Sequence, residues 1–328
     1  MSEFRIDQIT NQSGSRGPDI AGITTFSATS GMVMPSGPTE YRGGRDRGVF
    51  AGGIAPPSGT NVIEYITIST AGNAADFGDL SVVMWASGAC ASSTRGLFGG
   101  GNNPLTNTIT YITISSTGNT QYFSDLLAPT HSPAACSSST RGVFGGGYRI
   151  PSNTNVIQYV TIATTGNAAD FGDLTSNKRD IGSCSSSIRG IFAAGHPSTN
   201  AIDYITIAST GNAEDFGDLS VSRYGRRACS SSIRGIVGGG QSTTNIIEFI
   251  TISTLGDALD FGDLTQGREG HTSCSSSTRG IFAGGYPAYN IIEYVTIATT
   301  GDATDFGDLS QGKHALSSCS DAHGGLGD

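Results

Sequence analysis

The sequence has 328 residues, 48 of them Gly, and a formal net charge of −9 from 18 basic and 27 acidic side chains. Its longest apolar runs are interrupted by polar residues and fall short of the ~20 residues that span a bilayer, which excludes transmembrane and coiled-coil proteins. Arg recurs singly in an acidic chain, without the clustered cations that bind phosphate backbones, so we expect neither nucleic acid nor membrane insertion.

Residues 1–38 precede any repeat and carry β-prone apolar residues. Phe4, Ile6 and Ile9 alternate with polar residues, and a second apolar stretch follows at 20–26. A segment this short does not bury a core of its own. We therefore expect an extended arm that orders on a neighbouring protein by strand addition or wrapping. The charges within MSEFRIDQITNQ predict no secretory signal.

From residue 47 the chain repeats six times. Arg-Gly followed by apolar residues and glycines begins at Arg47, Arg95, Arg141, Arg189, Arg234 and Arg279. The motif Asp-Phe-Gly-Asp-Leu begins at Asp76, Asp170, Asp215, Asp260 and Asp305, and the second copy is altered to Tyr122-Phe-Ser-Asp-Leu126. Cys followed by Ser or Ala occurs at Cys90, Cys136, Cys184, Cys229, Cys274 and Cys319. These spacings define six units of about 46 residues.

Each unit predicts four short strands separated by turns. In the last complete unit the strands are expected at 273–278, 280–283, 291–298 and 303–309, with turns at 279–280, 284–287 and 300–302. The third strand has apolar residues on both sides, which indicates a sheet covered on both faces. Six units of four antiparallel strands are typical of a β-propeller. The sequence therefore predicts an all-β, six-bladed β-propeller over residues 39–328.

The two ends of the repeat predict how the ring closes. The Cys-Ser-Ser element is missing before Arg47, whereas one copy is left over at 315–321. We expect residues 314–322 to supply the inner strand of the first blade, whose other strands come from 48–80. Closure in this way leaves one Cys in each blade and removes the open sheet edge.

The six Cys residues are predicted to be free, buried and small, because their long spacing keeps them on separate blades. A metal site is the alternative. His131 and His314 precede a Cys by five residues and His271 precedes one by three, but the other units have no such His and no two Cys residues are close in sequence. We expect no metal and no cofactor.

The paired Asp residues of the Asp-Phe-Gly-Asp-Leu motif are predicted to be structural, because the motif lacks the alternating donors and closing Glu of a calcium loop. One Asp is expected to hold a turn or to accept a hydrogen bond from the recurrent Arg. That Arg is expected to bridge blades, with a ligand contact as the alternative. The Gly-Gly pairs are expected to form turns, since no Lys-Ser or Lys-Thr follows them. No unit adds a catalytic cluster, so the sequence predicts no enzyme and no catalytic residue.

Departures from the repeat are the candidate binding residues. The second unit has the altered 122–124 and a Pro-rich approach at 129–133. Five aromatic residues lie at or near predicted loops: Trp85, Tyr148, Tyr224, Tyr286 and Tyr289. Aromatic side chains on loops stack on sugar rings or anchor a protein partner, with ordinary loop packing as the alternative.

The repeat Thr-Ile-Ser-Thr-x-Gly-Asn/Asp-Ala-x-Asp-Phe-Gly-Asp-Leu, with the opening SEFRIDQITNQSGSRGP, resembles virion structural proteins of tailed phages that infect marine bacteria, especially cyanophages. The resemblance covers essentially the whole chain. The units are also similar to kelch repeats in the Gly-Gly pair and the Tyr-bearing strand that follows it. Where kelch repeats have Trp, this chain has Phe, as at Phe77, so no kelch function is carried over.

The resemblance implies a non-enzymatic component of a phage tail, baseplate or fibre, located in the virion after assembly in the host cytoplasm. Residues 1–38 are then the attachment arm to other virion proteins, and the propeller is presented to a host-surface glycan or a protein. The alternatives are a head decoration protein and a bacterial carbohydrate-binding propeller unrelated to a virion.

Overall fold

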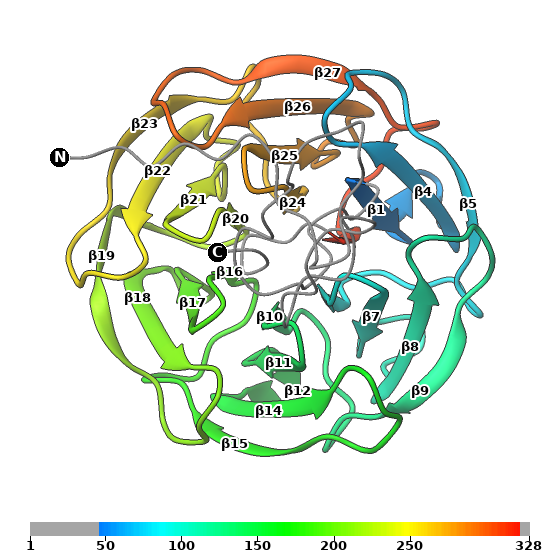
Figure 1. The fold of residues 1–328 in the computed structure, drawn as a ribbon, viewed down its shortest axis with the longest axis horizontal. Coiled ribbons are helices and arrows are strands. Elements are labelled where there is room, and N and C mark those ends of the chain that lie inside the picture. The colour runs from blue at the N-terminus through cyan, green and yellow to red at the C-terminus, as the bar shows by residue number, and fades with distance from the viewer. Residues whose placement is uncertain (1–45, 322–328) are drawn as a thin grey trace, which may run out of the picture. The chain divides into compact units, whose positions relative to one another are not determined.

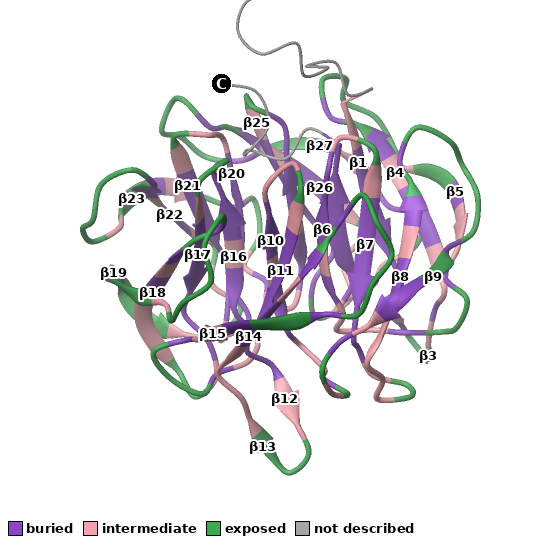
Figure 2. Cartoon of the chain, turned by 60° about the horizontal axis from the view of Figure 1, so that its bottom comes forward, coloured by how far each residue is buried: buried purple, intermediate pink, exposed green. Residues whose placement is uncertain are grey.

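The computed structural model describes residues 46–321, and within this range the chain forms six four-stranded antiparallel sheets arranged around an axis (Figure 1). The predicted all-β, six-bladed propeller is confirmed. The expected arm at 1–38 lies outside the described residues. Figure 2 shows the buried residues concentrated in the inner strands of the blades, and the exposed residues in the turns and on the outermost strands.

Each blade is a sheet whose four strands run from the axis outward. Blade 1 comprises β28 (Ser317–Ser320), β1 (Arg47–Ala51), β4 (Val62–Thr67) and β5 (Ala75–Asp79). Blade 2 comprises β6 (Gly88–Ala91), β7 (Arg95–Gly99), β8 (Thr108–Thr113) and β9 (Gln121–Asp125). Blade 3 comprises β10 (Ala134–Ser137), β11 (Arg141–Gly145), β14 (Val156–Thr161) and β15 (Ala169–Asp173).

The remaining three blades repeat this order. Blade 4 comprises β16 (Gly182–Ser185), β17 (Arg189–Ala193), β18 (Thr199–Thr206) and β19 (Glu214–Arg223). Blade 5 comprises β20 (Arg227–Ser230), β21 (Arg234–Gly238), β22 (Ile246–Thr251) and β23 (Leu259–Asp263). Blade 6 comprises β24 (Thr272–Ser275), β25 (Arg279–Ala283), β26 (Ile291–Thr296) and β27 (Thr304–Asp308). Two small hairpins extend from loops: β2 (Ile54–Ala55) with β3 (Ser58–Gly59), and β12 (Tyr148–Arg149) with β13 (Ser152–Asn153).

The first turn of each unit lies earlier than predicted. In blade 6 the turn occupies the residues before Arg279, which itself belongs to β25. The reason is a local hydrogen bond: the Ser276 hydroxyl accepts from the backbone N–H groups of Thr278 and Arg279 at 3.3 and 3.1 Å. A Ser side chain that bonds its own backbone two or three residues on holds a turn.

Ring closure by the C-terminal strand is confirmed. β28 pairs antiparallel with β1, with Gly48 opposite Ser320 and Ala51 opposite Ser317. The backbone N–H of Arg47 also donates to Asp321 Oδ1 at 2.7 Å. The two ends of the described chain are therefore joined in one blade.

The hydrophobic core lies between blades rather than within them. Its six clusters each combine side chains of two neighbouring blades. In one of them Phe50 of blade 1 lies with Ile281 and Phe306 of blade 6. The predicted covering of both sheet faces is thus confirmed, and stacking of blades is the main source of apolar burial.

The Cys residues are free and buried, as predicted. Each sulfur packs against the Gly of the Arg-Gly pair in a neighbouring blade, so that a Cβ on Gly48 would lie 2.9 Å from Cys274 Sγ. This close approach explains why Gly follows the recurrent Arg. Burial raises the pKa of the Cys184 thiol to about 12, which keeps it protonated and makes it a poor metal ligand.

A belt of hydroxyl groups links the inner strands around the axis. In five of the six blades the residue after Cys is Ser, and its hydroxyl donates to the backbone carbonyl of the equivalent residue in the preceding blade: Ser137 to Ala91, Ser185 to Ser137, Ser230 to Ser185, Ser275 to Ser230 and Ser320 to Ser275. Ala91 has no hydroxyl, so the junction between blades 1 and 2 lacks this bond.

The recurrent Arg bridges blades, as predicted. Arg47 lies 4.3 Å from the centroid of the Tyr65 ring in its own blade, and its Nη1 donates to the Ile114 carbonyl of blade 2 at 2.8 Å. Carbonyls of the next blade likewise accept from the other five: Arg95 to Ile162, Arg141 to Ile207, Arg189 to Ile252, Arg234 to Ile297 and Arg279 to Ile68.

The hydrogen bonds predicted for the Asp residues of the Asp-Phe-Gly-Asp-Leu motif are not formed. Within the described chain their carboxylates accept no hydrogen bond from Arg or from the backbone, because Arg reaches carbonyls instead. The outermost strand of each blade is bonded to the next blade at a junction that we call the outer seam. The bond is made by the Asn or Asp that follows Gly in the third turn. Asn119 Oδ1 accepts from the backbone N–H of Asp79 in the preceding blade at 2.9 Å. All six junctions have this bond.

The altered motif of blade 2 weakens its outer seam. In blade 1 the Phe77 carbonyl accepts from Gly118 N–H at 2.7 Å, and a Cβ on Gly78 would lie 2.5 Å from the Gly118 oxygen. Ser124 occupies the position equivalent to Gly78 in blade 2. There the Phe123 carbonyl accepts no hydrogen bond from the N–H of Gly166 in the turn of blade 3. The Ser124 hydroxyl is also buried without a partner.

Candidate functional site

Two sets of loops lie on one face of the propeller, which we call the loop face. They are the loop between the second and third strands of each blade and the loop from the fourth strand to the next blade. The hairpin of β12 and β13 projects from this face (Figure 2). The short turns between strands one and two, and between strands three and four, lie on the opposite face.

On the loop face, the loop leaving one blade pairs with the Gly-Gly loop of the next. Backbone bridges join Trp85 to Asn102, His131 to Tyr148, Arg179 to His196, Glu269 to Tyr286, and His314 to Ile54. At the sixth junction the backbone N–H of Gln241 donates to the Tyr224 carbonyl at 2.8 Å. These twelve residues form a circle at equivalent positions, which we call the variable ring.

The variable ring collects the chain's irregular residues. It contains the one Trp and three of the five His residues of the sequence. Four of the five aromatic residues predicted as binding candidates belong to it: Trp85, Tyr148, Tyr224 and Tyr286. The fifth, Tyr289, lies instead beneath the Arg268 guanidinium, 5.7 Å from its ring centroid. Tyr286 is 52% exposed and the other ring residues are half-buried.

Several neighbouring members of the ring have side chains in contact with one another. The rings of His131 and Tyr148 have centroids 5.0 Å apart, and Arg179 lies 5.3 Å from the Tyr148 centroid. His196 and Tyr224 have centroids 5.1 Å apart. Aromatic, imidazole and guanidinium groups of the ring therefore form local clusters that include members from different blades.

Beneath this surface, buried ion pairs fix the loops to the scaffold. Lys178 Nζ lies 3.0 Å from Asp203 Oδ2, and neither side chain is exposed by more than 1%. Equivalent buried pairs join Arg226 to Glu248, Arg268 to Glu293 and Lys313 to Glu64. In three of the four pairs the cation immediately precedes a ring residue in the sequence, and in each the acid lies on the third strand of the next blade.

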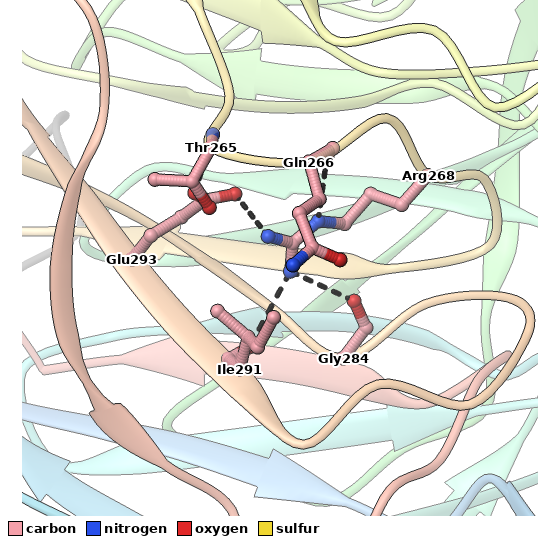
Figure 3. Close-up of polar contacts among 6 residues, drawn as sticks. All are labelled: Thr265, Gln266, Arg268, Gly284, Ile291 and Glu293. Carbon is pink, nitrogen blue, oxygen red and sulfur yellow. Dashed lines mark hydrogen bonds and ion pairs between the residues drawn. The ribbon is translucent and has the colours of Figure 1, made fainter.

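Figure 3 shows how fully one such pair is bonded. Arg268 is paired with Glu293 and also donates from Nη1 to the Gly284 carbonyl at 3.0 Å. Glu293 Oε2 accepts from the backbone N–H and the hydroxyl of Thr265, at 2.8 and 2.5 Å. Buried charges are tolerated when their remaining polar atoms are bonded in this way.

Two adjacent junctions are neutral at the same positions. Met84 and Thr110 replace the cation and the acid between blades 1 and 2, and Thr130 and Gln158 replace them between blades 2 and 3. Sequence reasoning missed these pairs. They could have been found because the position of the cation and the position of the acid are either both charged or both neutral in every unit.

The carboxyl of Glu64 shows the balance within a buried pair. Burial acts to raise its pKa, but the charge of Lys313 and hydrogen bonds from Lys313 and Ser310 outweigh it, so the pKa lies below the usual value. Glu64 is therefore ionised in the folded protein at neutral pH.

His271, the third His considered as a metal ligand, should make stability depend on pH. Its side chain is fully buried, and neither ring nitrogen has a hydrogen-bond partner. Burial lowers its pKa well below 6.5, and the nearby charges of Arg268 and Arg227 lower it further. The folded state keeps His271 neutral, whereas the unfolded chain binds a proton below pH ~6.5, so stability falls as pH drops below that value.

The His271→Leu variant, which copies Leu316 at the equivalent position of blade 1, should lose this dependence. Wild type should lose up to about 1.4 kcal/mol more per pH unit than the variant below pH ~6.5. Denaturant unfolding at a series of pH values between 5 and 8 measures the difference. Parallel stability profiles for the two proteins would show that His271 does not titrate on unfolding.

A cavity of about 70 Å³ lies on the axis, where the loops that carry the variable ring lead into the inner strands. Small and hydroxyl-bearing residues of all six blades line it, including Ser87, Thr272 and Ser317. Asp180 and Arg227 are its charged lining residues. A second axial cavity of about 60 Å³ is lined by the Cys, Ser and Ala residues of the inner strands.

The described residues contain no group of three or more His, Cys, Asp or Glu side chains placed to hold a metal ion. His131 and His314 belong to different parts of the variable ring. No helix that could cross a bilayer occurs in residues 46–321. No model of a known protein family matches the chain, and no curated protein matches it.

Proposed function

We propose that this protein is a non-enzymatic virion structural protein of a tailed phage, a component of the tail, baseplate or fibre, that binds a host-surface glycan through the variable ring. The observation that carries the binding role is the contrast between a repeated scaffold and a non-repeated ring. All six blades share the Arg bridges and the seam bonds, whereas the twelve ring positions hold eight different residue types.

The chemistry of the ring suits a glycan. Trp, Tyr and His present flat apolar faces with polar edges, which matches the apolar faces and hydroxyl rims of sugar rings. Amide and hydroxyl groups such as Asn102 and Gln241 supply further hydrogen-bonding capacity. Residues held by bridges and ion pairs lose little entropy on binding, which favours affinity.

The virion assignment rests on the resemblance of the repeat and of the opening segment to phage structural proteins. A rigid propeller with variable loops is a suitable platform for recognition. The proposal of no enzymatic activity rests on the absence, among the described residues, of a catalytic cluster confined to one blade. Attachment through residues 1–38 to other virion proteins remains part of the proposal and concerns residues outside the described range.

Mass spectrometry and density maps of purified particles test the assignment. The chain should be present in the tail, baseplate or fibre, and deletion of residues 1–38 should release it. Retention after that deletion would place the attachment in the propeller, and density on the capsid would make it a head decoration protein. Absence from particles, with glycan binding intact, would favour a bacterial carbohydrate-binding propeller.

Binding by the ring is tested with a glycan array. The protein should bind glycans on the array. The double variant Trp85→Ala, Tyr286→Ala should lose this binding while its melting temperature stays unchanged. Unchanged glycan binding by the double variant would place the binding surface elsewhere. Release of reducing ends from a bound glycan, lost on substitution of a single Asp, would show the protein to be an enzyme.

A further inference from the structure

The basic residues of the described chain have three different roles. Six Arg residues form the Arg-Gly bridges, and four Lys or Arg residues form the buried pairs. The other four are Arg149, Arg179, Arg223 and Arg227. All four belong to the loop face of blades 3 to 5, and we call them the arginine arc.

The arc is continuous with the variable ring. Arg179 is a ring residue, and Arg149 and Arg223 directly adjoin Tyr148 and Tyr224 in the sequence. Arg179 Nη1 donates to Asn153 Oδ1 at 3.2 Å, and Asn153 Nδ2 donates to the His196 carbonyl at 2.8 Å. Arginine and aromatic groups therefore alternate along this side of the ring.

The four arginines of the arc are half-buried, and the fold bonds each of them through only one or two donors. Arg149 Nε donates to Thr130 Oγ1 at 3.0 Å, but its Nη2 is buried without a partner. Arg223 Nη1 donates to the Gln241 carbonyl at 2.9 Å, whereas its Nε has no partner. Arg227 lines the axial cavity and donates from Nη1 to the Arg226 carbonyl at 2.9 Å.

The charge around the arc is opposite to that of the whole chain. Asp180 and Glu269 are the acidic side chains on the loops of this region, and Asp180 is bonded to Arg179. The four guanidinium groups therefore exceed the local acids by two, although the chain carries −9 overall. The Asp-Phe-Gly-Asp-Leu carboxylates lie on the outermost strands of the blades.

We propose that the arginine arc binds the carboxylate groups of an acidic polysaccharide. The guanidinium fork matches a carboxylate and bonds it through two parallel N–H donors, while the interleaved Tyr and His faces contact the sugar rings. Four cations on a chain of net charge −9 do not match the dense phosphates of a nucleic acid. This inference rests on the proposed glycan-binding function and names the class of glycan.

Binding of a polyuronate oligosaccharide to the full chain tests the inference, with a neutral glucan and a sulfated polysaccharide as comparison ligands. The polyuronate should bind best. Arg149→Gln and Arg223→Gln should each weaken it about tenfold, since a charged hydrogen bond is lost. The control is Glu269→Gln, which removes a negative charge from the same face and should strengthen binding. Melting temperatures verify folding.

Raising the salt concentration should weaken binding of the wild-type protein, and this measurement does not depend on any variant folding. Equal affinity for the neutral glucan, preference for the sulfated polymer or for DNA, or indifference to salt would overturn the inference. Binding of a neutral glycan that Trp85→Ala abolishes would overturn the inference and leave the proposed function standing. Failure to bind any glycan, with absence from particles, would reject both.

Discussion

Removal of residues 312–328 should abolish the single cooperative unfolding transition of the propeller. The truncation deletes β28, which pairs with β1 over four residues and fills the inner position of blade 1. It also removes Lys313, the buried partner of Glu64, and Ser320, whose hydroxyl bonds the Ser275 carbonyl at 2.6 Å. An unpaired β1 edge and an uncompensated buried carboxylate would remain.

A shorter truncation provides the control. Removal of 322–328 alone leaves every strand of blade 1 in place and should leave the melting temperature and its cooperativity unchanged. Calorimetry and denaturant unfolding of both truncated proteins decide the outcome. If the chain lacking 312–328 unfolds in one transition at the wild-type temperature, β28 does not close the ring.

The second large effect concerns the buried pair of Lys178 and Asp203. Asp203→Thr should destabilise the protein by about 3–5 kcal/mol, because the Lys178 ammonium stays buried without its partner. Lys178→Met should also destabilise it, since the carboxylate keeps only the N–H and hydroxyl of Thr175 as donors. The double variant copies the neutral Met84 and Thr110 of the first junction and should recover most of the loss.

Denaturant unfolding of the four proteins gives the coupling energy directly. The comparison variant is Asp180→Asn at the half-exposed pair with Arg179, where the loss should stay below about 1 kcal/mol. Additive losses in the Lys178 and Asp203 variants would mean that the two charges do not depend on each other.

Much of the scaffold could be predicted because it is repeated. A surplus Cys-Ser strand and a vacant place before Arg47 predicted the closure, and six identical Arg-Gly pairs predicted a bridging role. The hydrogen bonds expected of the Asp-Phe-Gly-Asp-Leu carboxylates are not formed, because the Asn or Asp of the third turn, such as Asn119, makes the bond to the outer strand instead.

The candidate site was less accessible to sequence reasoning. Trp85 and Tyr148 could be recognised as irregular loop residues, but their membership of one circle depends on the pairing of two loops from different blades. Glu293 occupies a position within an apolar strand, and its partner Arg268 lies on the loop before the blade. Only the stacking of blades brings such residues together.

In several loops a residue of a buried ion pair is followed directly by a residue at the surface, and this order has an evolutionary consequence. We call the first the anchored residue and the second the displayed residue. Lys178 is fixed in the interior, and the next residue, Arg179, faces the surface; Arg268 and Glu269 repeat this pattern. A substitution at the displayed residue leaves its neighbour's ion pair intact, and surface changes of this kind usually alter stability by no more than about 0.5 kcal/mol. Single codon changes can therefore diversify the surface chemistry of the propeller, because each variant along the way still folds.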